Sequence, residues 1–217
     1  MASSTAATRI PLLGSRSRPS RPAPAGGRAV ERIALLGVLI GLFGELHPAL
    51  DQWGQRSVDA RLKDLHGRHL VHLDGTPADG QDPDRADEAT TTADALGRRH
   101  AALHVAAYTA GQFAAAVVAT RALGYRVPVR ALLAGAAVNG ATHLVIDRRE
   151  PLLHLARWTG HLGYVEHCTA ARVGADGVVR AEPSGPGSAL FELDQSLHRA
   201  IGVAAAVATT WLATRSS

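Results

Sequence analysis

Long uncharged runs of residues alternate with polar segments along this chain, and they predict helices that cross a membrane. Residues 101–120 contain no Asp, Glu, Lys or Arg, and a helix needs roughly 20 apolar residues to cross a bilayer. Three shorter uncharged runs cover residues 33–44, 131–146 and 200–213. We therefore predict an all-α, integral membrane bundle of about four spanning helices over residues 33–213.

The polar segments predict the tail and the connections of this bundle. Residues 1–32 are rich in Ser, Pro, Ala and Arg, a composition typical of a disordered basic tail. Residues 74–97 combine seven carboxylates with Gly, Pro and Thr and predict a flexible acidic loop. Residues 170–189 predict a turn-rich loop. Residues 151–167 mix Leu, Trp and Tyr with Arg and His, which predicts an amphipathic helix at the membrane interface.

Histidines and aspartates stand where the apolar runs begin or end. In three places a His and an Asp are four residues apart, an interval that puts both on one face of a helix. The helices of an up-down bundle alternate in direction, so these ends meet on one side of the molecule. We expect one cluster there, formed by His47, Asp51, His104, His143, Asp147, Asp194 and His198.

Imidazole and carboxylate groups are good ligands for zinc, iron and manganese. Burying several such groups without a partner is costly, so we predict that all seven belong to a site for a divalent metal ion, with zinc as the first candidate. A metal-bound water attacks esters, amides or phosphoesters, which makes a metal-dependent membrane hydrolase the sharpest hypothesis. The pattern assigns no catalytic residue.

Two other classes of function stay open. The His/Asp pairs can be interhelical hydrogen bonds in a non-enzymatic membrane protein that has a structural or partner-docking role. Alternatively, the polar stripe that His104 shares with Tyr108 and Gln112 can carry protons or ions across the membrane. If variants of these pairs lose their fold and no metal is found in the protein, the first alternative is indicated. An activity that depends on the membrane potential would indicate the second.

Composition narrows these expectations. The net charge of +4 comes almost wholly from arginine, because Lys63 is the only lysine. We attribute this to codon composition and expect the lipid bilayer, not a nucleic acid, as the partner, in a multi-pass protein of the cell membrane. Cys168 is the single cysteine, so an intramolecular disulfide is excluded and any metal must use His and carboxylate ligands.

Four short motifs carry a resemblance to a known group of proteins. They are HPALDQWGQ from His47, HVAAYT from His104, THLVIDRR from Thr142 and LDQSLH from Leu193. In this order they resemble an uncharacterised bacterial, mainly actinobacterial, family of small multi-pass membrane proteins whose domain has no known function. The resemblance spans most of residues 45–212 and implies an integral membrane protein. More remotely, the third motif is similar to one in membrane-bound metal-dependent hydrolases, an analogy that does not establish activity.

Overall fold

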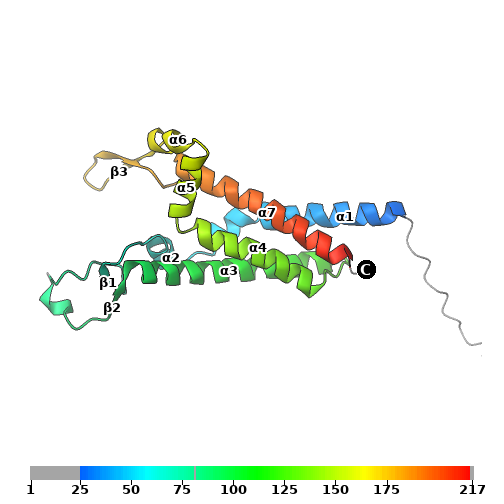
Figure 1. The fold of residues 1–217 in the computed structure, drawn as a ribbon, viewed down its shortest axis with the longest axis horizontal. Coiled ribbons are helices and arrows are strands. Elements are labelled where there is room, and N and C mark those ends of the chain that lie inside the picture. The colour runs from blue at the N-terminus through cyan, green and yellow to red at the C-terminus, as the bar shows by residue number, and fades with distance from the viewer. Residues whose placement is uncertain (1–24, 81, 216–217) are drawn as a thin grey trace, which may run out of the picture.

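The computed structural model describes residues 25–80 and 82–215, and long helices form the body of the molecule (Figure 1). Consecutive long helices alternate in direction along one common axis. The last of them packs against the first and the third, and the third packs against the second. These helices are α1 (Ala25–Ile40), α3 (Ala93–Ala122), α4 (Val129–Ile146) and α7 (Ala189–Arg215). The prediction of a mainly helical fold is confirmed.

The chain leaves α1 through two π-helical turns that surround a proline. These turns are η1 (Gly41–Glu45) and η2 (Ala49–Trp53), and Pro48 lies between them. Proline has no N–H, so it cannot donate to Phe43, the carbonyl five residues earlier, as a π-helical pattern would require. Such turns occur frequently at functional sites. Here they place His47 and Asp51 beside the other long helices.

Two small antiparallel hairpins and four short helices complete the described chain. The strand β1 pairs with β2, and β3 pairs with β4. Both hairpins lie toward the end of the bundle where α3 and α7 begin (Figure 1). The elements are α2 (Ser57–Leu62), β1 (Leu70–His72), η3 (Pro83–Arg85), β2 (Thr90–Thr92), α5 (Glu150–Trp158), α6 (Leu162–His167), β3 (Ala170–Val173) and β4 (Val179–Glu182).

Several boundaries differ from those expected from the sequence. Helix α1 begins at Ala25, inside the segment assigned to a basic tail, and residues 1–24 of that tail lie outside the described residues. The N-terminal part of α3 occupies the end of the predicted acidic loop, because the Thr92 hydroxyl accepts a hydrogen bond from Ala95 N and caps the helix there. The predicted interfacial helix is split at Gly160, whose φ of 77° ends α5.

Two of the described helices, α3 and α4, are long and apolar enough to cross a membrane. In the most apolar stretch of 18 residues, 33% is buried in α3 and 39% in α4. The core helix of a soluble protein is instead mostly buried. The other two long helices do not meet the same criterion within the described chain. α1 has 16 residues, and α7 carries Asp194, His198 and Arg199 in its first half.

The apolar core lies between the four long helices and uses many small side chains. Small residues let helix backbones approach closely. At Gly202, a Cβ atom would stand 2.6 Å from the Phe43 carbonyl oxygen, so only glycine allows α7 to pack against η1 at this distance. The core residues include Leu35, Leu39, Phe43, Ala116, Ala131, Leu132, Ala205, Ala206 and Ala213.

Candidate metal centre

The seven side chains singled out from the sequence lie together at one end of the bundle. His47 comes from the residues between η1 and η2, Asp51 from η2, His104 from α3, and the remaining two pairs from the end of α4 and the start of α7. The rings link the parts of the cluster, because the His198 centroid lies 4.7 Å from that of His47 and 4.3 Å from that of His143. All except Asp194 are buried. The predicted grouping is therefore present, whereas their role as metal ligands stays a prediction.

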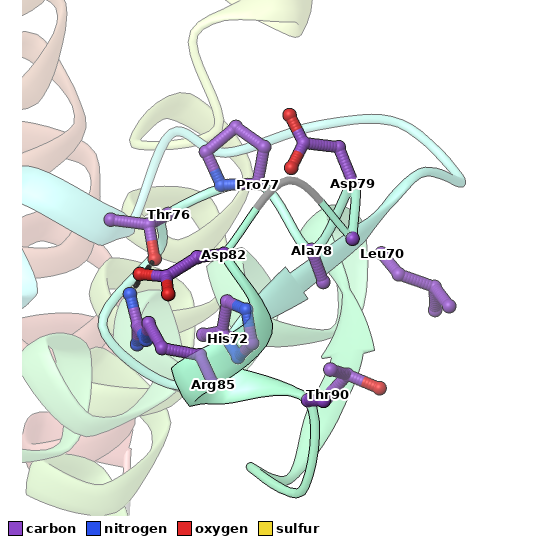
Figure 2. Close-up of a pocket in the computed structure, with 11 residues that line it drawn as sticks. Leu70, His72, Thr76, Pro77, Ala78, Asp79, Asp82, Arg85 and Thr90 are labelled. Atoms are coloured by element: carbon purple, nitrogen blue, oxygen red, sulfur yellow. Dashed lines mark hydrogen bonds between the residues drawn. The ribbon is translucent and has the colours of Figure 1, made fainter.

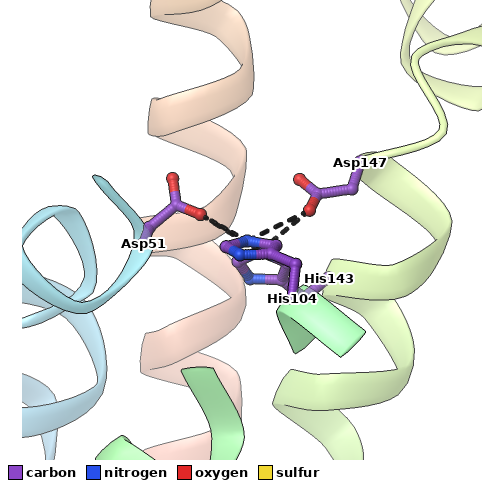
Figure 3. A group of neighbouring side chains, drawn as sticks. All are labelled: Asp51, His104, His143 and Asp147. Carbon is purple, nitrogen blue, oxygen red and sulfur yellow. Dashed lines mark hydrogen bonds and ion pairs between the residues drawn. The ribbon is translucent and has the colours of Figure 1, made fainter. Parts of the chain in front are cut away.

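Four of these residues, Asp51, His104, His143 and Asp147, bring one ligand atom each to within 4.8 Å of one another, with the two carboxylates on either side of the two rings (Figure 3). The Nε2 atom of His104 lies 2.9 Å from Asp51 Oδ1 and 3.3 Å from Asp147 Oδ2. The Nε2 atom of His143 lies 3.4 Å and 3.3 Å from the same two oxygens, and the two nitrogens are 3.1 Å apart. Around a tetrahedral zinc ion with bonds of about 2.0–2.1 Å, neighbouring ligand atoms are about 3.3 Å apart. The spacing fits such an ion.

Hydrogen bonds alone cannot satisfy these four groups. Each ring nitrogen carries at most one hydrogen, but the Nε2 atom of His104 faces two carboxylate oxygens and the Nε2 atom of His143. If both nitrogens are protonated, their hydrogens oppose each other. If one is not, its lone pair faces carboxylates. The Nδ1 atoms of both rings are also buried without a hydrogen-bond partner among the described residues. A cation between these atoms would bind both Nε2 lone pairs and both carboxylates, and each ring would then carry its hydrogen on Nδ1.

The two carboxyl groups are ionised at neutral pH. Burial raises the pKa of Asp51, but hydrogen bonds from His104 and His143 outweigh burial and hold the pKa well below its usual range. Burial likewise raises the pKa of Asp147, and the hydrogen bond from His143, together with the charge of Lys63, brings that pKa below its usual range. Ionised carboxylates only accept hydrogen bonds or bind cations, so both are available as ligands.

A buried polar network lies behind the cluster and fixes the hydrogen positions of one ring. Gln112 Nε2 donates to the Phe43 carbonyl at 3.0 Å and to the Tyr108 hydroxyl at 2.7 Å. Asn139 Nδ2 donates to Gln112 Oε1 and, at 3.3 Å, to the same hydroxyl. With two donors on its oxygen, Tyr108 directs its own hydrogen to His47 Nδ1 at 2.9 Å.

This network determines the tautomer of His47. Because Nδ1 accepts from Tyr108, neutral His47 carries its hydrogen on Nε2. That atom is buried and lies 3.8 Å from Asp51 Oδ2. This distance is too long for a hydrogen bond, so His47 directs an N–H toward Asp51 without bonding to it, and in this tautomer neither ring nitrogen has a lone pair free for a metal. Groups that surround a ligand tune its metal affinity.

A cavity of about 540 Å³ adjoins the carboxylate side of the cluster. Asp51, Asp147 and Asp194 line it, whereas the four histidines of the cluster do not. Its wall also carries Lys63, whose Nζ lies 3.1 Å from Asp147 Oδ2. Arg149 lines the cavity as well and has a φ of 59°, which is uncommon for a residue with a Cβ atom. The carboxylates are therefore accessible from the cavity, and the rings lie behind them.

A second pocket, of about 340 Å³, lies in the loop between β1 and β2 (Figure 2). It contains none of the seven cluster residues. Arg85 occupies its rim and pairs with Asp74 at 3.0 Å and with Glu88 at 2.6 Å. An arginine of the same loop neutralises these two carboxylates. We therefore interpret their role as stabilising the loop, not as binding a metal.

Several polar residues around the cluster were not singled out as site residues. Asn139 precedes His143 by four positions and therefore shares its helix face, a signal that the sequence does contain. Gln195 Nε2 lies 3.4 Å from Asp51 Oδ2 and follows Asp194 directly. Lys63 reaches Asp147 across 84 residues of sequence. No local pattern predicts that last contact.

No protein-family model, curated protein or solved structure matches this chain. The resemblance to the actinobacterial family therefore stays a prediction that depends on its four motifs.

Proposed function

We propose that this chain is an integral membrane protein that binds a divalent metal ion, zinc in the first instance, through Asp51, His104, His143 and Asp147. The convergence of four ligand atoms, with five of their six mutual distances at 2.9–3.4 Å and all within 4.8 Å, carries this proposal. Two imidazoles and two carboxylates suit zinc, and also iron or manganese. The low burial of the two most apolar helices supports a membrane location.

We further propose that the metal serves hydrolysis. Asp51 and Asp147 line a cavity of about 540 Å³, so an ion held by them can be reached by water and by a small substrate. Metal-bound water has a pKa lowered to about 7 and attacks esters, amides and phosphoesters. Four protein ligands fill a tetrahedral site, but zinc expands to five ligands in catalytic steps.

The first test is the metal content of detergent-purified protein, measured by elemental mass spectrometry. We expect stoichiometric metal in the wild type and its loss in the His143→Ala/Asp147→Ala double variant. His154→Ala removes an exposed histidine of α5 and serves as the matched control, which should keep the metal. If the double variant does not fold, Asp51→Asn removes one ligand charge with little change of shape.

The competing function is that of a non-enzymatic membrane protein whose polar groups hold the helices together. It predicts wild-type protein that is folded and contains no metal above background, an outcome that would reject the metal site. If the wild type binds metal but does not turn over chromogenic ester, amide or phosphoester substrates, the metal site is supported and the hydrolase function is rejected. Turnover that disappears in Asp51→Asn and returns when zinc is restored to chelated wild type would support both.

A further inference from the structure

Asp147, Asp194 and His198 form a second group beside the first. One ligand atom of each lies within 4.8 Å of the other two. Asp194 and His198 are one turn apart on α7, with Oδ2 and Nδ1 separated by 3.5 Å. Asp147 approaches from the end of α4 and belongs to both groups.

His198 has no satisfactory protonation state without a cation. Its side chain is 1% exposed. Nδ1 faces the Asp194 carbonyl oxygen at 2.9 Å and the Asp194 carboxylate, both of which are acceptors, while Nε2 is buried without a partner among the described residues. Protonation at Nδ1 satisfies that nitrogen but leaves the Nε2 lone pair unpaired, and protonation at Nε2 turns the Nδ1 lone pair toward oxygen. Protonation at both nitrogens leaves a buried N–H without an acceptor. Each state leaves a buried polar atom unsatisfied, whereas a cation on Nε2, with Nδ1–H donating to the Asp194 carbonyl, would satisfy both nitrogens.

We propose that Asp147, Asp194 and His198 bind a second divalent metal ion, and that Asp147 bridges the two ions. This inference rests on the proposed function of the first group. Three protein ligands leave a position for water, as catalytic zinc sites do. Asp194 is 24% exposed and lines the cavity together with Asp147. The second ion would therefore have an open position for water on the same cavity, and the first, bound by four ligands, would hold Asp147 in place.

Lys63 adds charge to the same region of the cavity. Its Nζ is 3.1 Å from Asp147 Oδ2, so it neutralises part of the charge of the bridging carboxylate. Asp51, Asp147 and Asp194 line one cavity with Asp64 and Glu182, against Lys63 and Arg149 as the basic groups. Asp64 pairs with Arg149 at 3.8 Å and Glu182 with Arg172 at 2.5 Å, so the excess consists of Asp51, Asp147 and Asp194 against Lys63. Buried charges are paired or coordinate metals, which is consistent with two divalent ions at these three carboxylates.

The test compares metal stoichiometry in the full chain after loading with Mn²⁺ and removal of excess ion. We expect two equivalents in the wild type, one in Asp194→Asn and one in His198→Gln, with His154→Gln as a control that keeps two. Electron paramagnetic resonance gives an independent reading. The wild type should show the spectrum of an exchange-coupled Mn²⁺ pair, and Asp194→Asn that of a single ion. Asp194 is partly exposed, so its amide variant is the one most expected to fold.

The possible outcomes separate this inference from the proposal on which it rests. One equivalent in the wild type that persists in Asp194→Asn and His198→Gln but disappears in His104→Gln would overturn the second site and keep the first. Two equivalents retained in both α7 variants would overturn the assignment of Asp194 and His198. Absence of bound Mn²⁺ from folded wild type would overturn both sites.

Discussion

At the scale of single residues, Tyr108 connects the polar interior of the bundle to the candidate metal centre. Its hydroxyl accepts from Gln112 and Asn139 and donates to His47, so all its hydrogen-bonding capacity is used. The orientation of Gln112 depends in turn on the Phe43 carbonyl, which can only accept. A backbone oxygen in a π-helical turn thus determines which nitrogen of His47 carries hydrogen.

Replacing Tyr108 with Phe should lower the free energy of unfolding by about 1–3 kcal/mol, because two amide donors and one ring nitrogen lose a buried partner. Metal affinity should also fall, by about 10–100-fold, since His47 no longer has a fixed tautomer beside Asp51. Thermal unfolding in detergent and metal titration measure the two effects. Thr109→Val is the matched control, because the Thr109 hydroxyl is buried without a partner within the described structure. Equal effects of both variants would contradict the role of Tyr108.

Contacts between residues four apart on one helix could be predicted from the sequence, whereas most contacts between distant segments could not. The pairs His143/Asp147 and Asp194/His198 follow from helical spacing, and their meeting follows from alternating helix directions. The contact between Lys63 and Asp147 depends on how the chain after η2 and α2 turns back toward α4. The hydrophobic periodicity of the sequence does not predict this turn. Likewise the network around Tyr108 depends on the bond from Gln112 to the Phe43 carbonyl, which joins residues 69 apart in the sequence.

At the scale of secondary-structure elements, close approach of α7 to η1 positions the first His/Asp pair. The helix pattern of the sequence gives no direct indication of η1 and η2, because a π-helical turn changes the hydrogen-bond register without changing composition. The hairpins β1–β2 and β3–β4 are also absent from the prediction, because their strands have only three or four residues and lie in polar segments. The long apolar helices were predictable because their runs exceed three turns.

Gly202→Ala should destabilise the protein by about 1–3 kcal/mol, the usual cost of overpacking. The new Cβ atom would meet the Phe43 carbonyl oxygen at 2.6 Å and its carbon at 2.8 Å, so the backbone of η1 has to move. Gly37→Ala is the control, because a Cβ atom there meets nothing within 4 Å and alanine favours the helix. Thermal unfolding of both variants tests this prediction, and an unfolding temperature for Gly202→Ala at or above that of Gly37→Ala would refute it.

At the scale of the whole molecule, the cluster draws on each of the four long segments of the bundle. Ligand candidates come from the turns after α1, from α3, from the end of α4 and from the start of α7. The apolar core lies between the same helices and contains many small side chains. Each of these buries little apolar surface and so contributes little to the free energy of folding. An ion held by groups from several helices would therefore stabilise their arrangement as well as support chemistry.

Removal of the metal should lower the unfolding temperature of the wild type by about 5–10 °C. An ion present at 100 times its dissociation constant stabilises the folded state by about 2.7 kcal/mol, and 1 kcal/mol corresponds to about 2–4 °C for a chain of this size. The measurement is thermal unfolding in detergent before and after chelation, followed by addition of Zn²⁺, which should restore the original temperature. In His143→Ala/Asp147→Ala the chelator should have no effect, because that variant lacks ligands of both proposed ions. An equal decrease in the double variant would assign the stabilisation to a metal bound elsewhere.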